Sequence, residues 1–390
     1  MAGTPYVELH AHSAYSFLDG ASLPEELAVR AAELGYEAFA LTDHDGVYGS
    51  LEFAHSAKAL GIRPITGAEV TLEGGAHVTL LVESPRGYAN LCRLLTASHA
   101  RERLQPALDL ELLAELSAGL VCLSGCARQG LGVLDPNGAA RLAGAFGRER
   151  FYVELQRPYL RGDARRNAVL RDLAAALRVR TVATGDVHAH HPRRARLQDA
   201  LVAIRHGAAL DACEPERRGN EEFVLTAPGG CAARFPDDPD AVRATVELAE
   251  RLEFDLTCEL GYRYPDFSAG EEPAAATLAR LCRREFAARY RHSAVRRRAE
   301  ARLEDELALI AELGLSGFFL LHWEVLELAR EVAVSVRGPG SPRHALPPGR
   351  GRGSSVGSIV CYLTGLSHVD PVANDLSLGR FLNREMASVP

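Results

Sequence analysis

The first half of the sequence predicts an α/β fold, and two observations favour a small barrel over a short open sheet. Seven β-rich runs alternate with segments of helical spacing between residues 6 and 188, which is typical of a mainly parallel sheet with crossover helices. Several of these runs end in His, Asp or Glu, and the carboxyl ends of barrel strands meet at one rim where active sites form. We therefore expect a seven-stranded barrel with a site at its rim.

The expected elements follow the hydrophobic periodicity along the chain. Strands are expected at Tyr6–His12, Ala38–His44, Pro64–Leu72, His77–Glu83, Leu120–Cys126, Phe151–Gln156 and Thr181–His188. The clearest helices between them are expected at Pro24–Leu34, Tyr88–His99 and Ala164–Leu177.

After residue 193 the pattern becomes helical, and a second block of helices follows an extended linker at residues 262–270. We therefore divide the chain into a first domain of residues 1–265 and a second domain of residues 266–390. The segment Val336–Gly353 is rich in Gly, Pro and Arg and is not expected to form regular structure. Helices are expected at Ala241–Leu252, Glu272–Tyr290, Ala294–Leu313 and Ser354–Leu366.

Composition and charge fit a globular protein of the reducing cytoplasm. Hydrophobic residues make up 47% and charged residues 24%, and no apolar run is long enough to span a membrane. The N-terminus lacks the layout of a secretory signal, and the eight cysteines include no CxxC pair. The net charge of −7 argues against coating nucleic acid through bulk electrostatics. Because Lys58 is the only lysine, we interpret arginine clusters such as Arg296–Arg298 as solvated helix faces.

The polar residues at the strand ends form a candidate metal site. Side chains at positions i and i+2 of a strand share a face, so His10 is expected beside His12, and Asp186 beside His188. A single buried histidine is usually a hydrogen-bonded core residue, but five strands that all carry ligand-type residues are hard to explain in that way. The many nitrogen ligands favour Zn²⁺ or Mn²⁺ over Mg²⁺. The candidate ligands are His10, His12, Asp19, His44, Glu69, His77, Cys126, Asp186 and His188.

Three of these candidates have an alternative structural interpretation. Asp19 lies in a Leu-Asp-Gly turn, His77 begins its strand where an exposed edge residue would lie, and Cys126 fits a small buried apolar position. Clustered metal ions activate a water molecule and hold both oxygens of an in-line displacement at phosphorus. Phosphate-ester hydrolysis is therefore the expected reaction class.

A second feature is the Gly/Ser-rich loop at Gly351–Ser358. Glycines allow backbone N–H groups to approach an anion closely, and a following helix presents its positive N-terminus to phosphate. The spacing is not that of an ordinary P-loop. By itself the loop is equally compatible with a flexible connector.

The motifs together resemble the PHP domain (polymerase and histidinol phosphatase). The resemblance rests on His10-Ala11-His12-Ser13, Leu18-Asp19-Gly20, Leu41-Thr42-Asp43-His44-Asp45-Gly46, Gly67-Ala68-Glu69 and Asp186-Val187-His188. It implies a distorted seven-stranded α/β barrel that binds up to three metal ions, with Cys126 at a position where His or Cys is acceptable.

The rest of the chain resembles the bacterial DNA polymerase III alpha subunit, a C-family DNA polymerase. The resemblance rests on His77–Val82, Gly87–Leu91, Leu123–Cys126, Glu306–Leu320, Gly351–Ser358, Gly365–Pro371 and Arg380–Asn383. The last three motifs look like the start of a nucleotidyltransferase-like palm domain. The resemblance implies that Arg352, Gly353, Ser354 and Arg380 bind the incoming nucleotide. Two departures are an apparent insertion at Ser341–Arg350 and Arg384-Glu385-Met386 in place of the usual Pro-Glu-Arg.

This resemblance implies a parent DNA-directed DNA polymerase of replication or repair, in the cytoplasm. Its substrates would be primer-template DNA and deoxynucleotide triphosphates, with Mg²⁺ as the polymerase cofactor. The sliding clamp and other replisome subunits would bind through later regions, and no membrane is involved. The catalytic palm aspartates are expected beyond Pro390, so this chain as given is not expected to polymerise DNA.

Several interpretations stay open at this point. The parent protein is either the main replicase or an error-prone polymerase. The PHP site is a 3′–5′ exonuclease, a pyrophosphate hydrolase or a structural element. The alternatives to a polymerase fragment are a stand-alone metal-dependent phosphoesterase and a non-catalytic, metal-stabilised scaffold.

Overall fold

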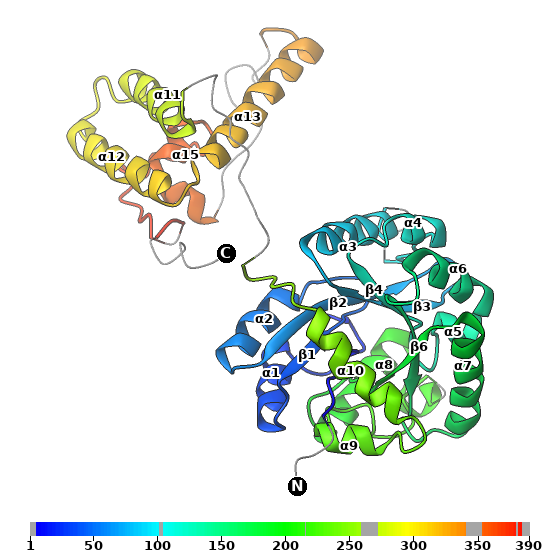
Figure 1. Cartoon of the computed structure of the whole chain (residues 1–390). Helices are drawn as coiled ribbons and strands as arrows, with labels where there is room; N and C mark the ends of the chain where they lie inside the picture. Colours follow the sequence, from blue (N-terminus) through cyan, green and yellow to red (C-terminus); the bar gives the residue numbers. More distant parts are fainter. Residues whose placement is uncertain are drawn as a thin grey trace. The chain divides into compact units, whose positions relative to one another are not determined.

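The computed structural model describes residues 5–100, 104–214, 216–258, 272–340, 353–379 and 381–383. These residues belong to two compact units, residues 1–260 and residues 261–390, and Figure 1 shows the elements of each. Arg352 and Arg380, two of the expected nucleotide-binding residues, lie outside the described residues.

The first unit is a mixed α/β structure around one curled sheet of six strands in sequence order. The strands are β1 (Ala38–Leu41), β2 (Arg63–Thr71), β3 (His77–Val82), β4 (Leu120–Leu123), β5 (Phe151–Gln156) and β6 (Arg180–Thr184). The pairs β1–β2, β4–β5 and β5–β6 are parallel, as predicted. Strand β3 runs antiparallel to both of its neighbours. A tight connection of five residues, 72–76, between β2 and β3 explains the exception, because parallel neighbours need a crossover of a dozen or more residues.

The expected first strand, Tyr6–His12, is not a regular strand among the described residues. Its backbone pairs only at isolated positions, Glu8 with Phe39 on one side and Ala11 with Val187 on the other. The Glu8 carboxylate accepts hydrogen bonds from the backbone N–H groups of Leu9 at 3.1 Å and His10 at 3.0 Å. These two N–H groups therefore bond locally, while backbone hydrogen bonds such as Ala40 N to Glu8 O and His12 N to Val187 O still join the segment to its neighbours.

Helices cover the outer face of the sheet in the first unit (Figure 1). Pro24 starts the first helix at a position where its missing N–H costs nothing, and the predicted helices near residues 88–99, 164–177 and 241–252 are present. The helices are α1 (Pro24–Glu33), α2 (Ser50–Ala59), α3 (Pro85–Ser98), α4 (Leu110–Glu115), α5 (Leu131–Leu134), α6 (Pro136–Phe146), α7 (Asp163–Leu177), α8 (Ala195–His206), α9 (Pro228–Ala233) and α10 (Pro239–Arg251), with short 3-10 turns η1 (Pro192–Arg194) and η2 (Leu210–Cys213).

The inner face of the sheet changes from apolar to polar along the strands. At one end, alternate strand residues such as Ala40, Ile65 and Val182 pack against Leu248 and Leu252, at the end of α10. Continuing at intervals of two residues, β2 reaches Glu69, β5 reaches Glu154 and Gln156, and β6 reaches Thr184, all buried. The sheet therefore has an apolar end sealed by α10 and an opposite end lined with polar side chains.

The second unit is helical, with a core of its own built from buried side chains such as Leu303, Phe319 and Val360. The helices are α11 (Ala274–Arg289), α12 (Arg296–Glu312), α13 (Ser316–Arg337), the 3-10 turn η3 (Gly353–Gly357) and α15 (Ile359–Leu363). No single described helix is long and apolar enough to cross a membrane; α12 and α13 reach that length and composition only together, with a bend of 111° between them.

Candidate metal centre

Glu69, near the end of β2, lies at the middle of the polar end of the sheet. Its carboxylate is 2.6 Å from His44 Nδ1, 3.3 Å from His77 Nδ1, 3.6 Å from His10 Nε2 and 3.7 Å from His12 Nε2. Burial alone would raise the pKa of Glu69, but the charges of His77 and His44 lower it well below its ordinary value. A carboxylate in the middle of four imidazoles is an arrangement suited to divalent metal ions.

The antiparallel direction of β3 brings His77 into this group. Its residue pairing places His77 opposite Thr71 and Thr79 opposite Glu69. The start of β3 therefore lies beside the end of β2, at the rim where the parallel strands end. His77 is not an isolated residue at a strand edge, although it begins its strand.

His10 is oriented by a buried carboxylate that the sequence analysis did not single out. His10 Nδ1 is 2.6 Å from Glu154 Oε1 and 3.2 Å from Thr79 Oγ1, and Gln156 Nε2 donates to Glu154 Oε1 at 2.8 Å. Burial alone would lower the pKa of His10, but the charge and hydrogen bond of Glu154 raise it to about 10. Glu154 and Gln156 share a strand face at i and i+2, which is the signal that could have identified them.

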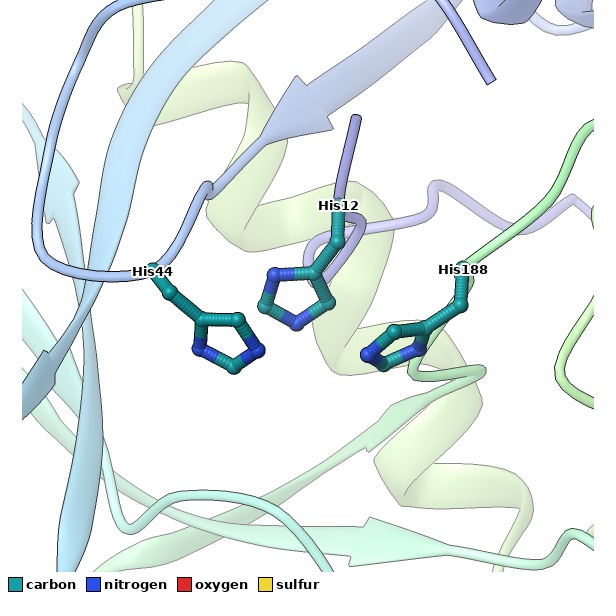
Figure 2. Close-up of side chains that lie close together, drawn as sticks. All are labelled: His12, His44 and His188. Atoms are coloured by element: carbon teal, nitrogen blue, oxygen red, sulfur yellow. The ribbon is translucent and has the colours of Figure 1, made fainter. Parts of the chain in front are cut away.

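His12, His44 and His188 point toward one another from three separate segments (Figure 2). The ring centroids of His12 and His44 are 4.2 Å apart, and those of His12 and His188 are 4.3 Å apart. His188 Nδ1 lies 2.9 Å from the backbone carbonyl oxygen of Asp186. Because a carbonyl only accepts, Nδ1 carries the proton and Nε2 presents its lone pair.

Several buried ligand atoms lack a hydrogen bond among the described residues. They are His10 Nε2, His12 Nε2, His77 Nδ1 and Glu69 Oε1. Leaving one such group unsatisfied costs about 1–3 kcal/mol, so a cluster of four is expected to have a partner that satisfies them together. The donor set and these unsatisfied atoms fit divalent metal ions.

Seven of the nine predicted ligands fall into three overlapping groups whose ligand atoms lie within 4.8 Å of one another. The groups are His10, His12 and Asp186; His44, Glu69 and His77; and His12, His44 and His188. The other two predicted ligands are close by. Asp19 Oδ2 is 3.3 Å from His44 Nε2, and Cys126 lines the same pocket.

The ligand cluster opens into a pocket of about 500 Å³. Four of its lining residues are basic, namely Arg128, Arg205, His206 and Arg218. Two strongly exposed apolar residues, Phe17 (81% exposed) and Leu104 (87% exposed), also border it. The pocket therefore combines a ligand cluster, positive charge and an exposed aromatic ring.

Arg218 is a further residue of the site that the sequence did not indicate, because it lies in an aperiodic loop. Its Nη2 donates to both Asp19 oxygens at 3.2 Å and to His188 Nε2, and its Nη1 lies 3.4 Å from Asp186 Oδ2. Burial alone would raise the pKa of Asp19, but the guanidinium of Arg218 lowers it well below its ordinary value.

In the second unit, Gly353 and Ser354 lie in η3 and are exposed. Their backbone is therefore accessible, but no described residue identifies what it binds.

Both the first and the last part of the chain match known protein families. The PHP domain matches residues 8–158, and the bacterial DNA polymerase III alpha NTPase domain matches residues 276–390. The error-prone DNA polymerase of Symbiobacterium thermophilum is 37% identical over 413 residues, which cover 99% of this chain and 36% of the relative. The error-prone DNA polymerase of Mycolicibacterium paratuberculosis is 37% identical over 404 residues, which cover 98% of this chain and 36% of the relative.

Among solved structures, the lesion-specific endonuclease PfuEndoQ of Pyrococcus furiosus is similar with a TM-score of 0.33 and 15% identity, over 47% of this chain and 48% of that chain. The chain spans about a third of the length of the curated relatives that it matches. The two family matches in this order, with 37% identity along nearly the whole chain to relatives named error-prone DNA polymerase, show that the chain carries a PHP domain in its first part and a bacterial DNA polymerase III alpha NTPase domain in its last part.

Proposed function

We propose that the first unit is a metal-dependent phosphoesterase that removes nucleotides from the 3′ end of single-stranded DNA, within the N-terminal part of a DNA-directed DNA polymerase. One observation carries the hydrolase assignment: four ligand atoms of His10, His12, Glu69 and His77 are buried close together without a hydrogen-bond partner in the described part of the chain. Divalent ions satisfy such atoms, and they supply the charge that activates water and holds phosphate oxygens in phosphodiester hydrolysis.

The ions are proposed to be Zn²⁺ or Mn²⁺, because imidazole nitrogens predominate among the ligands. His10, His12 and Asp186 would hold one ion, and His44, Glu69 and His77 would hold another. Cys126 is proposed to complete the ligand set from the pocket wall.

The pocket wall supplies groups for binding a nucleotide. Arg205 Nη1 lies 3.2 Å from Asp19 Oδ2 with its side chain 41% exposed, so its remaining N–H groups face the opening. We assign Arg205 to a substrate phosphate, since a guanidinium donates two parallel hydrogen bonds to phosphate oxygens. Phe17 is assigned to stack on the terminal base, because an exposed ring beside a basic pocket is the usual platform for single-stranded nucleic acid.

The proposed first domain comprises residues 1–265 and the second residues 266–390. The segment 6–12 is proposed to act as the seventh strand of a distorted PHP barrel. Its isolated bridges to β1 and to the residue Val187 beyond β6 support this assignment. The second domain is proposed to contain a helical connector and the beginning of the polymerase palm, with Gly353 and Ser354 at the nucleotide triphosphate.

The polymerase activity is proposed for the longer protein. The relatives named error-prone DNA polymerase support it and favour that branch over the main replicase. Its substrates would be primer-template DNA and deoxynucleotide triphosphates with Mg²⁺, in the cytoplasm, and the sliding clamp would be its partner.

The experiment that tests the hydrolase is digestion of 5′-labelled single-stranded DNA by the purified chain in Mn²⁺ or Zn²⁺. We expect a ladder of products shortened from the 3′ end, and none with the His12→Ala variant. Intact DNA with both proteins would refute the exonuclease, and a higher melting temperature in the metal would then identify a metal-stabilised scaffold.

A second variant separates DNA from a small phosphate ester as the substrate. Phe17→Ala is expected to raise the KM for single-stranded DNA roughly 5- to 150-fold, because one stacked base contributes about 1–3 kcal/mol. Hydrolysis of bis(p-nitrophenyl) phosphate, which has no base to stack, should keep its KM. Equal effects on both substrates would contradict a stacking role for Phe17.

A further inference from the structure

The ligand cluster has two parts, which differ in whether their buried polar atoms have hydrogen-bond partners. Four atoms have no hydrogen-bond partner among the residues that the structure describes: His10 Nε2, His12 Nε2, His77 Nδ1 and Glu69 Oε1. In contrast, the atoms of Asp19 and His188 that face the pocket are bonded to the guanidinium of Arg218. The first part therefore requires metal ions as partners for its atoms. The second part is already paired with a cation, the guanidinium of Arg218.

Arg218 is held firmly in this position. It is buried, with 8% of its surface exposed, and its guanidinium carbon lies 5.0 Å from the centre of the Phe223 ring. The loop that carries it is fixed on both sides: His188 N donates to Phe223 O at 2.8 Å, and Arg128 donates to the carbonyl oxygens of Glu216 and Arg217 at 3.2 and 2.9 Å. Packing and hydrogen bonds therefore fix the position of the Arg218 guanidinium within the site.

The three ligand groups overlap, and His188 determines whether the third group can hold an ion of its own. His12 and His44 of the third group each also belong to one of the other two groups. Only His188 is particular to the third group, and its Nε2 lone pair accepts the hydrogen bond from Arg218 Nη2. A nitrogen lone pair that accepts this hydrogen bond is not available to a metal ion.

We propose that Arg218 takes the place of a third metal ion, so that the centre holds two ions and one permanent guanidinium charge. An arginine suits this role because its charge is not lost at any ordinary pH and its planar fork reaches several acceptors at once. Its N–H groups reach both Asp19 oxygens at 3.2 Å and Asp186 Oδ2 at 3.4 Å, so the guanidinium supplies positive charge to the two carboxylates through hydrogen bonds. This inference rests on the proposed metal centre.

The proposal gives the guanidinium a constant role in the reaction. A metal ion at Asp19 and His188 would be lost or exchanged with the metal supply, whereas Arg218 is always present. Its charge balances Asp19 and Asp186 and leaves Glu69 and the unsatisfied histidines for the two ions.

The test is a count of bound Mn²⁺ on the whole chain by equilibrium dialysis and elemental analysis. We expect two ions per wild-type chain and three per Arg218→Met chain, because methionine keeps much of the volume but frees His188 Nε2 and Asp19 Oδ1, while Asp19 Oδ2 keeps its contact with Arg205. The matched control is Arg234→Met, which removes an arginine that is 7% exposed and bonded to Glu222 and Thr226 instead of the ligands; it should keep two ions.

The outcomes separate the inference from the function on which it rests. Three ions in the wild-type chain would overturn the role of Arg218 while leaving the metal centre standing, and this result does not depend on any variant folding. No ion in the wild-type chain would overturn both. Two ions in both the wild-type and a folded Arg218→Met chain, with folding verified by circular dichroism, would show that Arg218 does not exclude a third ion.

Discussion

At the level of single residues, Glu154 determines which nitrogen of His10 faces the other ligands. Its carboxylate accepts a hydrogen bond from Nδ1–H of His10 at 2.6 Å. The other ring nitrogen, Nε2, is therefore directed toward Glu69 and Asp186. Carboxylates that orient metal-binding histidines in this way contribute about 10- to 100-fold to metal affinity. We predict that Glu154→Gln weakens Mn²⁺ binding by about that factor, measured by isothermal titration calorimetry.

A comparison variant makes this prediction specific. Glu222→Gln neutralises a carboxylate that pairs with Arg234 and not with a proposed ligand, and its Mn²⁺ affinity should equal that of the wild type. An equal loss in both variants would mean that general destabilisation, and not orientation of His10, lowers the affinity.

The sequence could predict which histidines lie near one another at the rim, but not Glu154 and Arg218, which contact them. The histidines and Asp186 occur at the ends of apolar runs, so strand periodicity alone assigns them to one rim. Glu154 shares a strand face with Gln156, but the periodicity of the sequence does not show that this face meets His10. Arg218 lies in a loop without periodicity, and only the pairing of that loop with residues 188 and 189 brings it to Asp19.

At the level of elements, β3 shows why strand positions were easier to predict than strand direction. Its apolar alternation defines residues 77–82, and the structure has these bounds. Direction depends on the loop before it, where Gly74 and Gly75 both have positive φ and allow a tight turn. The regular strand–helix alternation elsewhere predicted parallel pairing, and this local turn reverses β3 and brings His77 to the rim.

In the second unit, Glu306 of α12 binds the N-terminus of α15 and makes this contact sensitive to pH. Its carboxylate accepts hydrogen bonds from Ile359 N at 3.0 Å, Val360 N at 3.2 Å and the hydroxyl of Ser358. Burial raises the pKa of Glu306 above its ordinary value of 4.5, although these hydrogen bonds oppose the shift. The folded state therefore keeps this proton to a higher pH than the unfolded chain does.

The sign of the pH effect follows from this shift. The contribution of Glu306 to the free energy of unfolding is complete below about pH 4.5 and is lost as the pH rises through the raised pKa. We predict that protection of the α15 amides against hydrogen exchange, corrected for the intrinsic rate, falls across this window in the wild type. Glu306→Gln should remove this slope, and a slope that persists in the variant would assign the effect to another group.

At the level of the whole molecule, the metal centre is expected to stabilise only the unit that contains it. Every proposed ligand lies between residues 10 and 188, and Arg218 belongs to the same compact unit. A ligand that binds only the folded state at about 100 times its Kd stabilises that state by about 2.7 kcal/mol. For a unit of this size we expect the melting temperature to rise by roughly 5 to 10 °C.

The measurement that resolves the two units is hydrogen exchange on the whole chain with Mn²⁺ and with EDTA. Protection should increase in β2, β5 and β6, which carry or adjoin the ligands and share one core, and should stay unchanged in α11, α12 and α13. These helices have a separate hydrophobic core that contains no ligand residue among its described members. Equal gains in α12 and α13 would instead show that metal binding in the first unit is coupled to folding of the second, so that the two units act as one cooperative structure.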